Sequence, residues 1–238
     1  MLIVNADDFG AARSATDAIL ETFEAGAISS ASAMVWMPDS ERAAGLAREH
    51  GLAVGLHLNL TLPLQGPGAP PAVAERQLRM TERFEPESWW RGTVRGVRQE
   101  EVSQVVGDQL DRFRAQFGEP THINGHHHVH VMDLVLAALP PGIPVRQAPT
   151  TPGAVGRPDA RAERISRLFR APWATLDITS VHPGLGGGGL DLLVELRSHT
   201  IEVVTHPQHA DQRAALLDPA WQATVSAAGG LGSFSDLG

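Results

Sequence analysis

The sequence predicts an α/β domain built around a parallel sheet, and three observations support this fold class. Short apolar segments alternate with amphipathic segments along the chain, as in right-handed β-α-β connections. The length of 238 residues suits one α/β barrel. Several apolar segments end in ionisable residues, as barrel strands do at the face that carries an active site.

The first quarter of the chain contains two strand-helix units and a third strand. Periodicity predicts a helix that begins at Ser14, which would serve as its N-cap, and ends near Gly26. A second helix is expected to end at Gly51. We expect the elements, in order, to be a strand at 2–4, a helix at 14–25, a strand at 32–36, a helix at 40–50 and a strand at 52–61.

The segment from 63 to 86 breaks this rhythm. It is rich in proline and glycine and has no clear period. Long irregular segments inside a compact domain usually have a functional role or are mobile. We therefore expect a lid over the site. Trp89 and Trp90 follow, and they suit a sugar-stacking surface and a core position equally well.

The second half of the chain continues the alternation. Residues 100–117 form a strongly amphipathic helix with one apolar stripe. A glycine run at 186–189 lacks the strand and helix of a dinucleotide site. The tail from 229 onward should be frayed. The other expected elements are helices at 132–139, 160–169 and 190–196, and strands at 143–146, 176–179 and 200–206. Because no linker or repeat interrupts the series, one domain should span 1–238.

Composition excludes several classes of partner and chemistry. The net charge of -8 argues against a nonspecific grip on nucleic acid or on an anionic membrane. There is no cysteine, so a metal would have to bind His, Asp or Glu. No apolar run is long enough to span a membrane, and the N-terminus lacks the features of a signal peptide. A cytoplasmic location is the expectation.

The segment from Thr121 to His130 is the densest functional signal. It places five of the 11 histidines within nine residues. Imidazole is the commonest protein ligand for metals at neutral pH. A solvated loop and an affinity tag are the competing interpretations, but a tag would not be internal and interrupted by Val129. The run therefore favours a metal or catalytic role.

Ionisable residues at four predicted strand ends should converge on one face of the barrel. Each alone has an ordinary explanation, because an Asp pair can cap a helix and a single His can be a hydrogen-bonded core residue. One carboxylate with two imidazoles leaves positions open for water and substrate, as catalytic metal sites do. A second, adjacent carboxylate could then act as general base, and a further His as acid. The converging residues are Asp7, Asp8, His57, His126, His128 and His206.

Three motifs resemble those of the YdjC-like carbohydrate deacetylases. They are Ile3-Val4-Asn5-Ala6-Asp7-Asp8-Phe9-Gly10, Gly55-Leu56-His57-Leu58-Asn59-Leu60-Thr61, and Thr121-His122-Ile123-Asn124-Gly125-His126-His127-His128-Val129-His130. Their order and approximate spacing agree, and the resemblance runs from residue 1 to about residue 210. It implies a TIM-like, deformed (β/α) barrel of the glycoside hydrolase/deacetylase type. It also implies hydrolysis of the acetamide of N-acetylated sugars such as chitooligosaccharides, with release of acetate.

The resemblance also implies residue roles. Asp7 would be the base, His206 the general acid, and Arg146 would orient Asp7. We further expect substrate contacts from two residues of the motifs. The implied metal ligands are Asp8, His57 and His126, and the expected substrate-binding residues are His128 and Asn59.

The chain departs from the family pattern at three places. Asn124-Gly125 stands where the family usually has Asp-Ser, and Thr205-His206-Pro207-Gln208 stands where Cys-His-Pro-Gly is common. The segment 63–86 is also unlike the usual family loop. These changes spare the three metal ligands, but they affect the protonation role of His206 and the identity of the sugar.

Two alternatives stay open beside the sugar deacetylase. One is a metal-dependent hydrolase of another amide or ester, for example in hopanoid lipid synthesis. The other is a metal-binding barrel without catalysis, which would have no need of Asp7 as a second carboxylate. The ligand set suits Zn²⁺, whereas family members are often associated with Mg²⁺. The oligomeric state stays open between monomer and homodimer.

Overall fold

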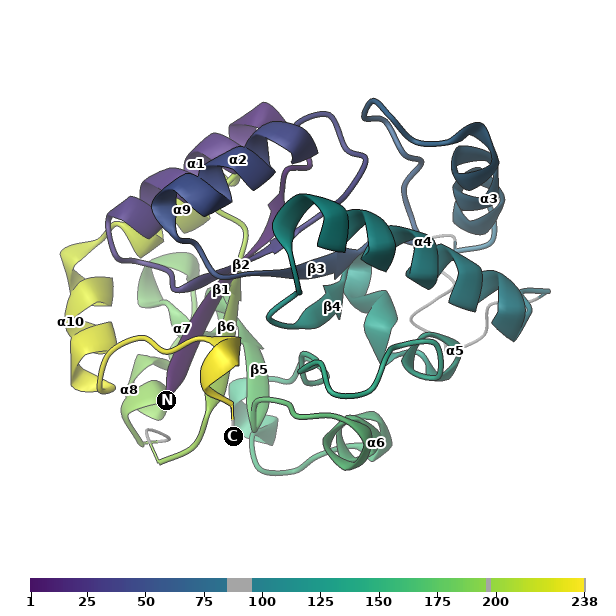
Figure 1. Cartoon of the computed structure of the whole chain (residues 1–238). Coiled ribbons are helices and arrows are strands. Elements are labelled where there is room, and N and C mark those ends of the chain that lie inside the picture. Colours follow the sequence, from purple (N-terminus) through teal and green to yellow (C-terminus); the bar gives the residue numbers. More distant parts are fainter. Residues whose placement is uncertain (85–95, 196–197, 238) are drawn as a thin grey trace.

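A computed structural model describes residues 1–84, 96–195 and 198–237. Its centre is a sheet of six parallel strands in the order β4-β3-β2-β1-β6-β5 (Figure 1). The expectations for Trp89, Trp90 and the last two residues of the 63–86 segment lie outside the described residues. The strands are β1 (Leu2–Phe9), β2 (Ser30–Ala33), β3 (Val54–Leu58), β4 (Ile123–Gly125), β5 (Ala174–Asp177) and β6 (Ile201–Thr205).

A short irregular segment joins the two edges of the sheet. Val145 forms an isolated parallel bridge to Ile123 of β4, and Pro149 forms another to Thr175 of β5. The strand predicted at 143–146 is therefore reduced to single bridges, because the prolines at 144 and 149 cannot donate ladder hydrogen bonds. The sheet curls into the deformed (β/α) barrel that the sequence predicts.

Helices cover the outside of the curled sheet (Figure 1). The helix predicted at 40–50 is confirmed, and that at 100–117 begins one residue earlier. Gly51 adopts the left-handed conformation at the end of α2, as predicted. The helices are α1 (Arg13–Glu24), α2 (Ser40–His50), α3 (Pro71–Thr81), α4 (Gln99–Phe117), α5 (Asp133–Leu136), α6 (Ala160–Leu168), α7 (Ile178–Val181), α8 (Leu190–Glu195), α9 (Ala210–Leu216) and α10 (Pro219–Ala227).

The core lies between the sheet and these helices. All eight residues of β1 are buried, as expected of a central strand covered on both faces. The predicted stripe of α4 is also buried, including Val102, Val106 and Phe113. The cap predicted for α1 is wrong. Ala12 is its N-cap and makes no side-chain cap hydrogen bond, while Ser14 lies inside the helix.

The segment after β3 is more regular than predicted. It contains α3, which begins at Pro71, a residue suited to the first turn of a helix. The helix packs against α4 (Figure 1), and Met80 and Phe84 are buried. The sequence analysis missed this helix because its amphipathic pattern is short and follows a segment rich in proline and glycine. The described part of the predicted irregular insert is thus a loop followed by a packed helix.

The C-terminal tail is not frayed, so that prediction is wrong. Phe234 is fully buried, and its ring stacks on that of His122 with centroids 3.8 Å apart. Leu237 is buried against Ile3, and Leu231 bridges to Leu2. These contacts lie beside the first residues of β1 and β4. The tail therefore fills the end of the barrel at which the strands begin, and its glycines and serines concealed two apolar anchors.

Candidate active site

The two adjacent aspartates owe their placement to an irregularity in β1. Side chains of neighbouring residues in a regular strand point to opposite faces. The pairing of β1 with β2 shifts register between Ala6 and Phe9, and Asp8 has a positive φ of 71°. This bulge turns the strand so that Asp7 and Asp8 both contact His57.

Asp8, His57 and His126 form the cluster predicted from the sequence. Asp8 Oδ1 lies 3.3 Å from His57 Nε2 and 3.1 Å from His126 Nδ1. One ligand atom of each residue lies within 4.8 Å of the others. His57 is buried on β3, whereas Asp8 and His126 are partly exposed. One carboxylate and two imidazoles, open to solvent on one side, fit a divalent metal ion with free positions for other ligands.

Asn124 fixes the orientation of His57. Its Nδ2 donates to Ser32 Oγ at 2.6 Å and lies 3.4 Å from Asp7 Oδ1. An ionised carboxylate only accepts hydrogen bonds, so the amide oxygen must face His57, whose Nδ1 lies 2.6 Å away. Burial lowers the pKa of His57, but the charges of Asp7 and Asp8 outweigh it and raise this pKa. When the ring is neutral, the amide oxygen of Asn124 holds its proton on Nδ1, and the lone pair of Nε2 is available to a metal ion on the side of Asp8. Partners of this kind fix the tautomer of metal-binding histidines.

Asp7 is held in a different environment from its neighbour. Arg146 donates to both of its oxygens, at 2.6 and 2.7 Å, and Asn5 donates to Oδ1 at 2.9 Å. Burial alone would raise the pKa of Asp7, but the charges of Arg146 and His57 outweigh it and hold this pKa far below its usual range. Asp7 is therefore ionised at neutral pH.

Arg146 is itself completely buried between two carboxylates. Besides Asp7, it donates to Glu202 Oε1 of β6 at 2.8 Å. Glu202 also accepts from Thr175 Oγ1 of β5 at 3.0 Å. The irregular segment between β4 and β5 thus positions the guanidinium of Arg146 beneath Asp7, between Asp7 and Glu202. Two carboxylates compensate the cost of burying this charge.

The histidines after β4 adopt an unusual backbone. His127 and His128 have positive φ values of 53° and 58°, a backbone conformation that residues other than glycine rarely adopt. Burial, followed by the charge of His126 for His127 and of Arg146 for His128, lowers the pKa of each to about 4. Both rings are neutral at pH 7. His127 Nδ1 lies 3.1 Å from Thr61 Oγ1 after β3.

Comparison with known proteins places the chain in a family. A family model described as YdjC-like protein matches residues 1–227. The chain belongs to the YdjC-like family. It is 33% identical over 217 residues to a carbohydrate deacetylase of Geobacillus stearothermophilus, an alignment that covers 88% of this chain and 80% of the relative.

Two further comparisons extend this result. A chitooligosaccharide deacetylase of Serratia marcescens is 38% identical over 157 residues, which are 61% of this chain and 58% of the relative. The crystal structure of a putative cellobiose-phosphate cleavage protein from Enterococcus faecalis V583 aligns with a TM-score of 0.75 at 21% identity. That alignment covers 99% of this chain and 98% of the other, and it supports the fold.

The remaining predicted residues of this YdjC-like chain lie in distinct settings. His206 follows β6, and its backbone N–H donates to Gln212 Oε1 at 2.7 Å. Thr205 pairs with Ala6 of β1, so His206 and Asp7 directly follow paired residues of neighbouring strands. Asn59 is buried, and its side chain bonds the backbone of Thr61 and Leu62 in the turn after β3. The side chain of Asn59 thus shapes this turn, and its role in substrate binding stays a prediction.

Sequence reasoning missed several polar residues that support the site. Gln208 donates to Asp8 Oδ2 at 2.8 Å, at the position where the family commonly has glycine. Ser32 Oγ bonds Asn5, Asn124 and His122 Nε2, so it links β2 to β1 and, across β3, to β4. Asn5 lies within the first motif and Gln208 within the last, so their position was a usable signal. Ser32 carried no such signal, because serine is common in every kind of element.

The membrane expectation can also be compared with the structure. Among the described residues, no helix has both the length and the apolar character needed to cross a bilayer.

Proposed function

We propose that this chain is a metal-dependent hydrolase that removes the N-acetyl group from an acetylated amino sugar or a chitooligosaccharide-like substrate. The observation that carries the proposal is the pairing of two unlike carboxylates. Asp8 lies with two imidazoles in a set of ligands that is open on one side, while Asp7, one residue away, is held by Arg146. The names of the two deacetylase relatives support the choice of reaction.

Asp8, His57 and His126 would hold one Mg²⁺ or Zn²⁺ ion, and a bound ion would supply Lewis-acid chemistry for the acetamide carbonyl. Two imidazoles favour Zn²⁺, because Mg²⁺ prefers oxygen ligands. The proton of His57 on Nδ1, held by Asn124, leaves Nε2 free to bind. Gln208 holds the second oxygen of Asp8, so a single oxygen of that carboxylate faces the two histidines.

Asp7 is the base in this proposal. It accepts a proton from the water that attacks the carbonyl carbon, and the C–N bond then breaks to give acetate and the free amine. Arg146 fixes both oxygens of Asp7 and keeps the carboxylate ionised at neutral pH. The acceptor is therefore always in its deprotonated form, and its position is set before substrate arrives.

His206 would donate the proton that the leaving amine requires. An amine is a poor leaving group unless it is protonated, so an acid on the side opposite Asp7 is needed. His128 is proposed to contact the substrate, since its ring is neutral and its buried Nδ1 has no hydrogen-bond partner among the described residues. The loop before α3 is proposed as the lid. Thr61, just before that loop, contacts His127.

A release assay separates this function from the alternatives. Metal-loaded protein is expected to release acetate from diacetylchitobiose, and His57→Ala is expected to lose both bound metal and activity. His50→Ala, at the end of α2, is the control and should retain both. Hydrolysis of simple esters without activity on any N-acetyl sugar would favour the hydrolase of another substrate. Metal binding without hydrolysis of either class would favour the non-catalytic barrel.

The Arg146–Asp7 pair argues against a barrel that only binds metal. Burying a carboxylate is costly unless it is paired, and binding alone gives this second carboxylate no task. A cytoplasmic location and the choice between monomer and homodimer remain predictions from the sequence.

A further inference from the structure

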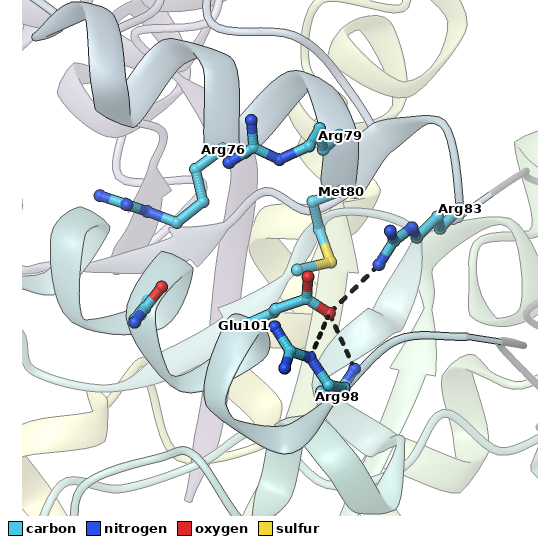
Figure 2. Close-up of a pocket in the computed structure, with 7 residues that line it drawn as sticks. Arg76, Arg79, Met80, Arg83, Arg98 and Glu101 are labelled. Carbon is cyan, nitrogen blue, oxygen red and sulfur yellow. Dashed lines mark hydrogen bonds and ion pairs between the residues drawn. The ribbon is translucent and has the colours of Figure 1, made fainter.

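A second concave site lies between α3 and the beginning of α4, and it is lined mainly by arginines. The cavity has a volume of about 130 Å³. Figure 2 shows its lining, with Arg83 and Arg98 directed toward Glu101 and Met80 beside them. Among the residues that the structure describes, Glu101 is the one carboxylate of the lining. The lining residues are Arg76, Arg79, Met80, Arg83, Arg98, Glu101 and Gln104. None of them belongs to the cluster around Asp8.

The charge of this pocket is opposite to that of the whole chain. The protein carries a net charge of -8 with 19 basic residues, and four of those residues line this pocket. Three of them, Arg76, Arg79 and Arg83, lie three and four positions apart on one face of α3 and just beyond its end, a spacing at which like charges repel one another. Arg76 and Arg79 each pair with a carboxylate outside the lining, Asp108 and Glu75. Arg83 and Arg98 share a single carboxylate, Glu101, so the excess of positive charge lies at these two side chains.

The ion pairs of the pocket leave donors free among the described residues. Arg76 uses Nε and Nη2 for Asp108 Oδ2, at 2.9 and 2.8 Å. Arg83 uses Nη1 for Glu101 and for the carbonyl of Gly96. A guanidinium has five N–H donors, so further bonds are available on both side chains.

Glu101 already demonstrates that the pocket accepts an oxyanion. Its Oε2 lies 3.1 Å from Arg83 Nη1, 3.0 Å from the backbone N of Arg98 and 3.7 Å from Arg98 Nε (Figure 2). The N-terminus of α4, a helix of 19 residues, adds the positive end of its dipole at the same place. Two independent sources of positive potential therefore meet beside the cavity.

We propose that this arginine pocket binds the phosphoryl group of a small soluble compound. The planar guanidinium matches the geometry of phosphate oxygens and binds them in pairs. The cavity is too small for more than a compact group, and the acidic surface elsewhere disfavours an extended polyanion or an anionic bilayer.

Pyrophosphate is a suitable probe, measured by calorimetry on the metal-loaded full chain at constant ionic strength. Arg83→Gln and Arg98→Gln are each expected to weaken binding by about tenfold or more, the scale of a lost charge-assisted hydrogen bond. Arg114→Gln is the matched control. Arg114 is 39% exposed and forms a 3.1 Å ion pair with Glu119, while Arg83 is 38% exposed and forms a 3.1 Å pair with Glu101. The control should leave the affinity unchanged.

A change of opposite sign gives a second test. Glu101→Gln removes the one carboxylate of the lining and keeps a side chain that can still accept from the Arg98 N–H. It is expected to tighten pyrophosphate binding several-fold. Unfolding curves of each variant confirm that the fold is retained. An arginine variant that fails to fold is replaced by the Lys substitution at the same position, which keeps the charge but removes the planar guanidinium.

The outcomes that overturn the proposal are distinct. Binding that is lost in His57→Ala but kept in Arg83→Gln would belong to the metal cluster. If Arg83→Gln and Arg114→Gln weakened pyrophosphate binding equally, the effect would come from the overall charge of the protein and not from the pocket. Absence of saturable pyrophosphate binding, or binding to vesicles that contain phosphatidic acid without binding to pyrophosphate, would also overturn it. None of these results depends on deacetylase activity.

Discussion

Asn124 and Arg146 each control the protonation of a neighbour at the site. Asn124 decides which nitrogen of His57 carries the proton, and Arg146 keeps Asp7 ionised. The resemblance implied a role for Arg146, whereas Asn124 appeared only as a departure from the family pattern. Its role depends on the amide being oriented by Asp7 and Ser32, which are distant in sequence.

The Asn124→Leu substitution tests the role of this amide. Leucine has a similar size but accepts no hydrogen bond, so His57 loses the partner that fixes its tautomer. We expect metal affinity to fall by about 10–100-fold, the usual effect of losing such a partner. Competition with a metal chelator measures it. Gln147→Leu is the control, because Gln147 is a buried amide that bonds Ser166 of α6 and none of the proposed metal ligands. Unchanged affinity in Asn124→Leu would contradict the tautomer argument.

The Asp7→Asn substitution separates the base from the metal ligands. The amide keeps the size of Asp7 but lacks the basic oxygen, so kcat on an N-acetyl sugar should fall by about 100-fold or more. Metal content should remain near that of the parent protein. Steady-state kinetics and metal analysis of the same preparation measure both. Near-normal turnover would mean that the base is elsewhere.

Asp7→Asn should also affect stability, because Arg146 would remain buried with one carboxylate partner instead of two. Breaking a buried pair costs about 3–5 kcal/mol. We expect a lower free energy of unfolding in denaturant titrations. An unchanged free energy would contradict the idea that Arg146 needs both Asp7 and Glu202.

Among the elements, α3 holds the turn that follows β3. Gln77 donates to the backbone carbonyls of Asn59 and Leu62 at 2.9 and 2.8 Å, and Gln109 of α4 donates to Asn59 O at 2.6 Å. The turn begins two residues after His57. The buried amide of Gln77 therefore connects α3, the helix after the proposed lid loop, with the turn that follows His57, a proposed metal ligand.

Gln77→Leu should loosen this turn. It removes the two hydrogen bonds that Gln77 donates to the turn and the one that its Oε1 accepts from Gln109. The carbonyl of Leu62 is left with fewer partners, and the expected cost is about 1–3 kcal/mol. Hydrogen exchange at residues 59–62 should become faster than exchange within β1. Gln104→Leu, on the neighbouring helix and outside this network, is the control. Equal exchange in both variants would rule out the proposed connection.

Periodicity and glycine stops predicted the elements that bury a regular stripe, as α2 and α4 show. These sequence signals failed where contacts between distant segments determine the structure. The bulge at Asp8 depends on pairing with β2, and the segment around Arg146 is shaped by two edges that are remote in sequence. The cluster of Asp8, His57 and His126 could be predicted because each of these residues lies at or near the end of a strand. Ser32 and Glu202 could not, because their role requires knowing which side chains face the barrel interior.

On the scale of the whole molecule, the C-terminal tail completes the core at the end where the strands begin. Phe234 is the anchor, and its ring covers His122. Phe234→Ala should lower the free energy of unfolding by about 3–5 kcal/mol, as for other buried aromatic truncations. Thermal or denaturant unfolding measures the change. Leu217→Ala, at a residue 36% exposed, is the control and should cost far less. Comparable losses would show that the tail is not anchored by Phe234.

Because this tail packs against the first strand, both chain ends lie on one side of the molecule. Met1 packs beside Ile3, Phe234 and Leu237, and its amino group donates to the carbonyl of His199 at 2.8 Å. The ligand-rich loops lie at the opposite strand ends. A fusion partner or a solid support attached through either terminus would therefore lie on the side opposite the proposed active site. The barrel is suited to immobilisation by its ends, provided that the linker leaves Phe234 and Leu237 in place.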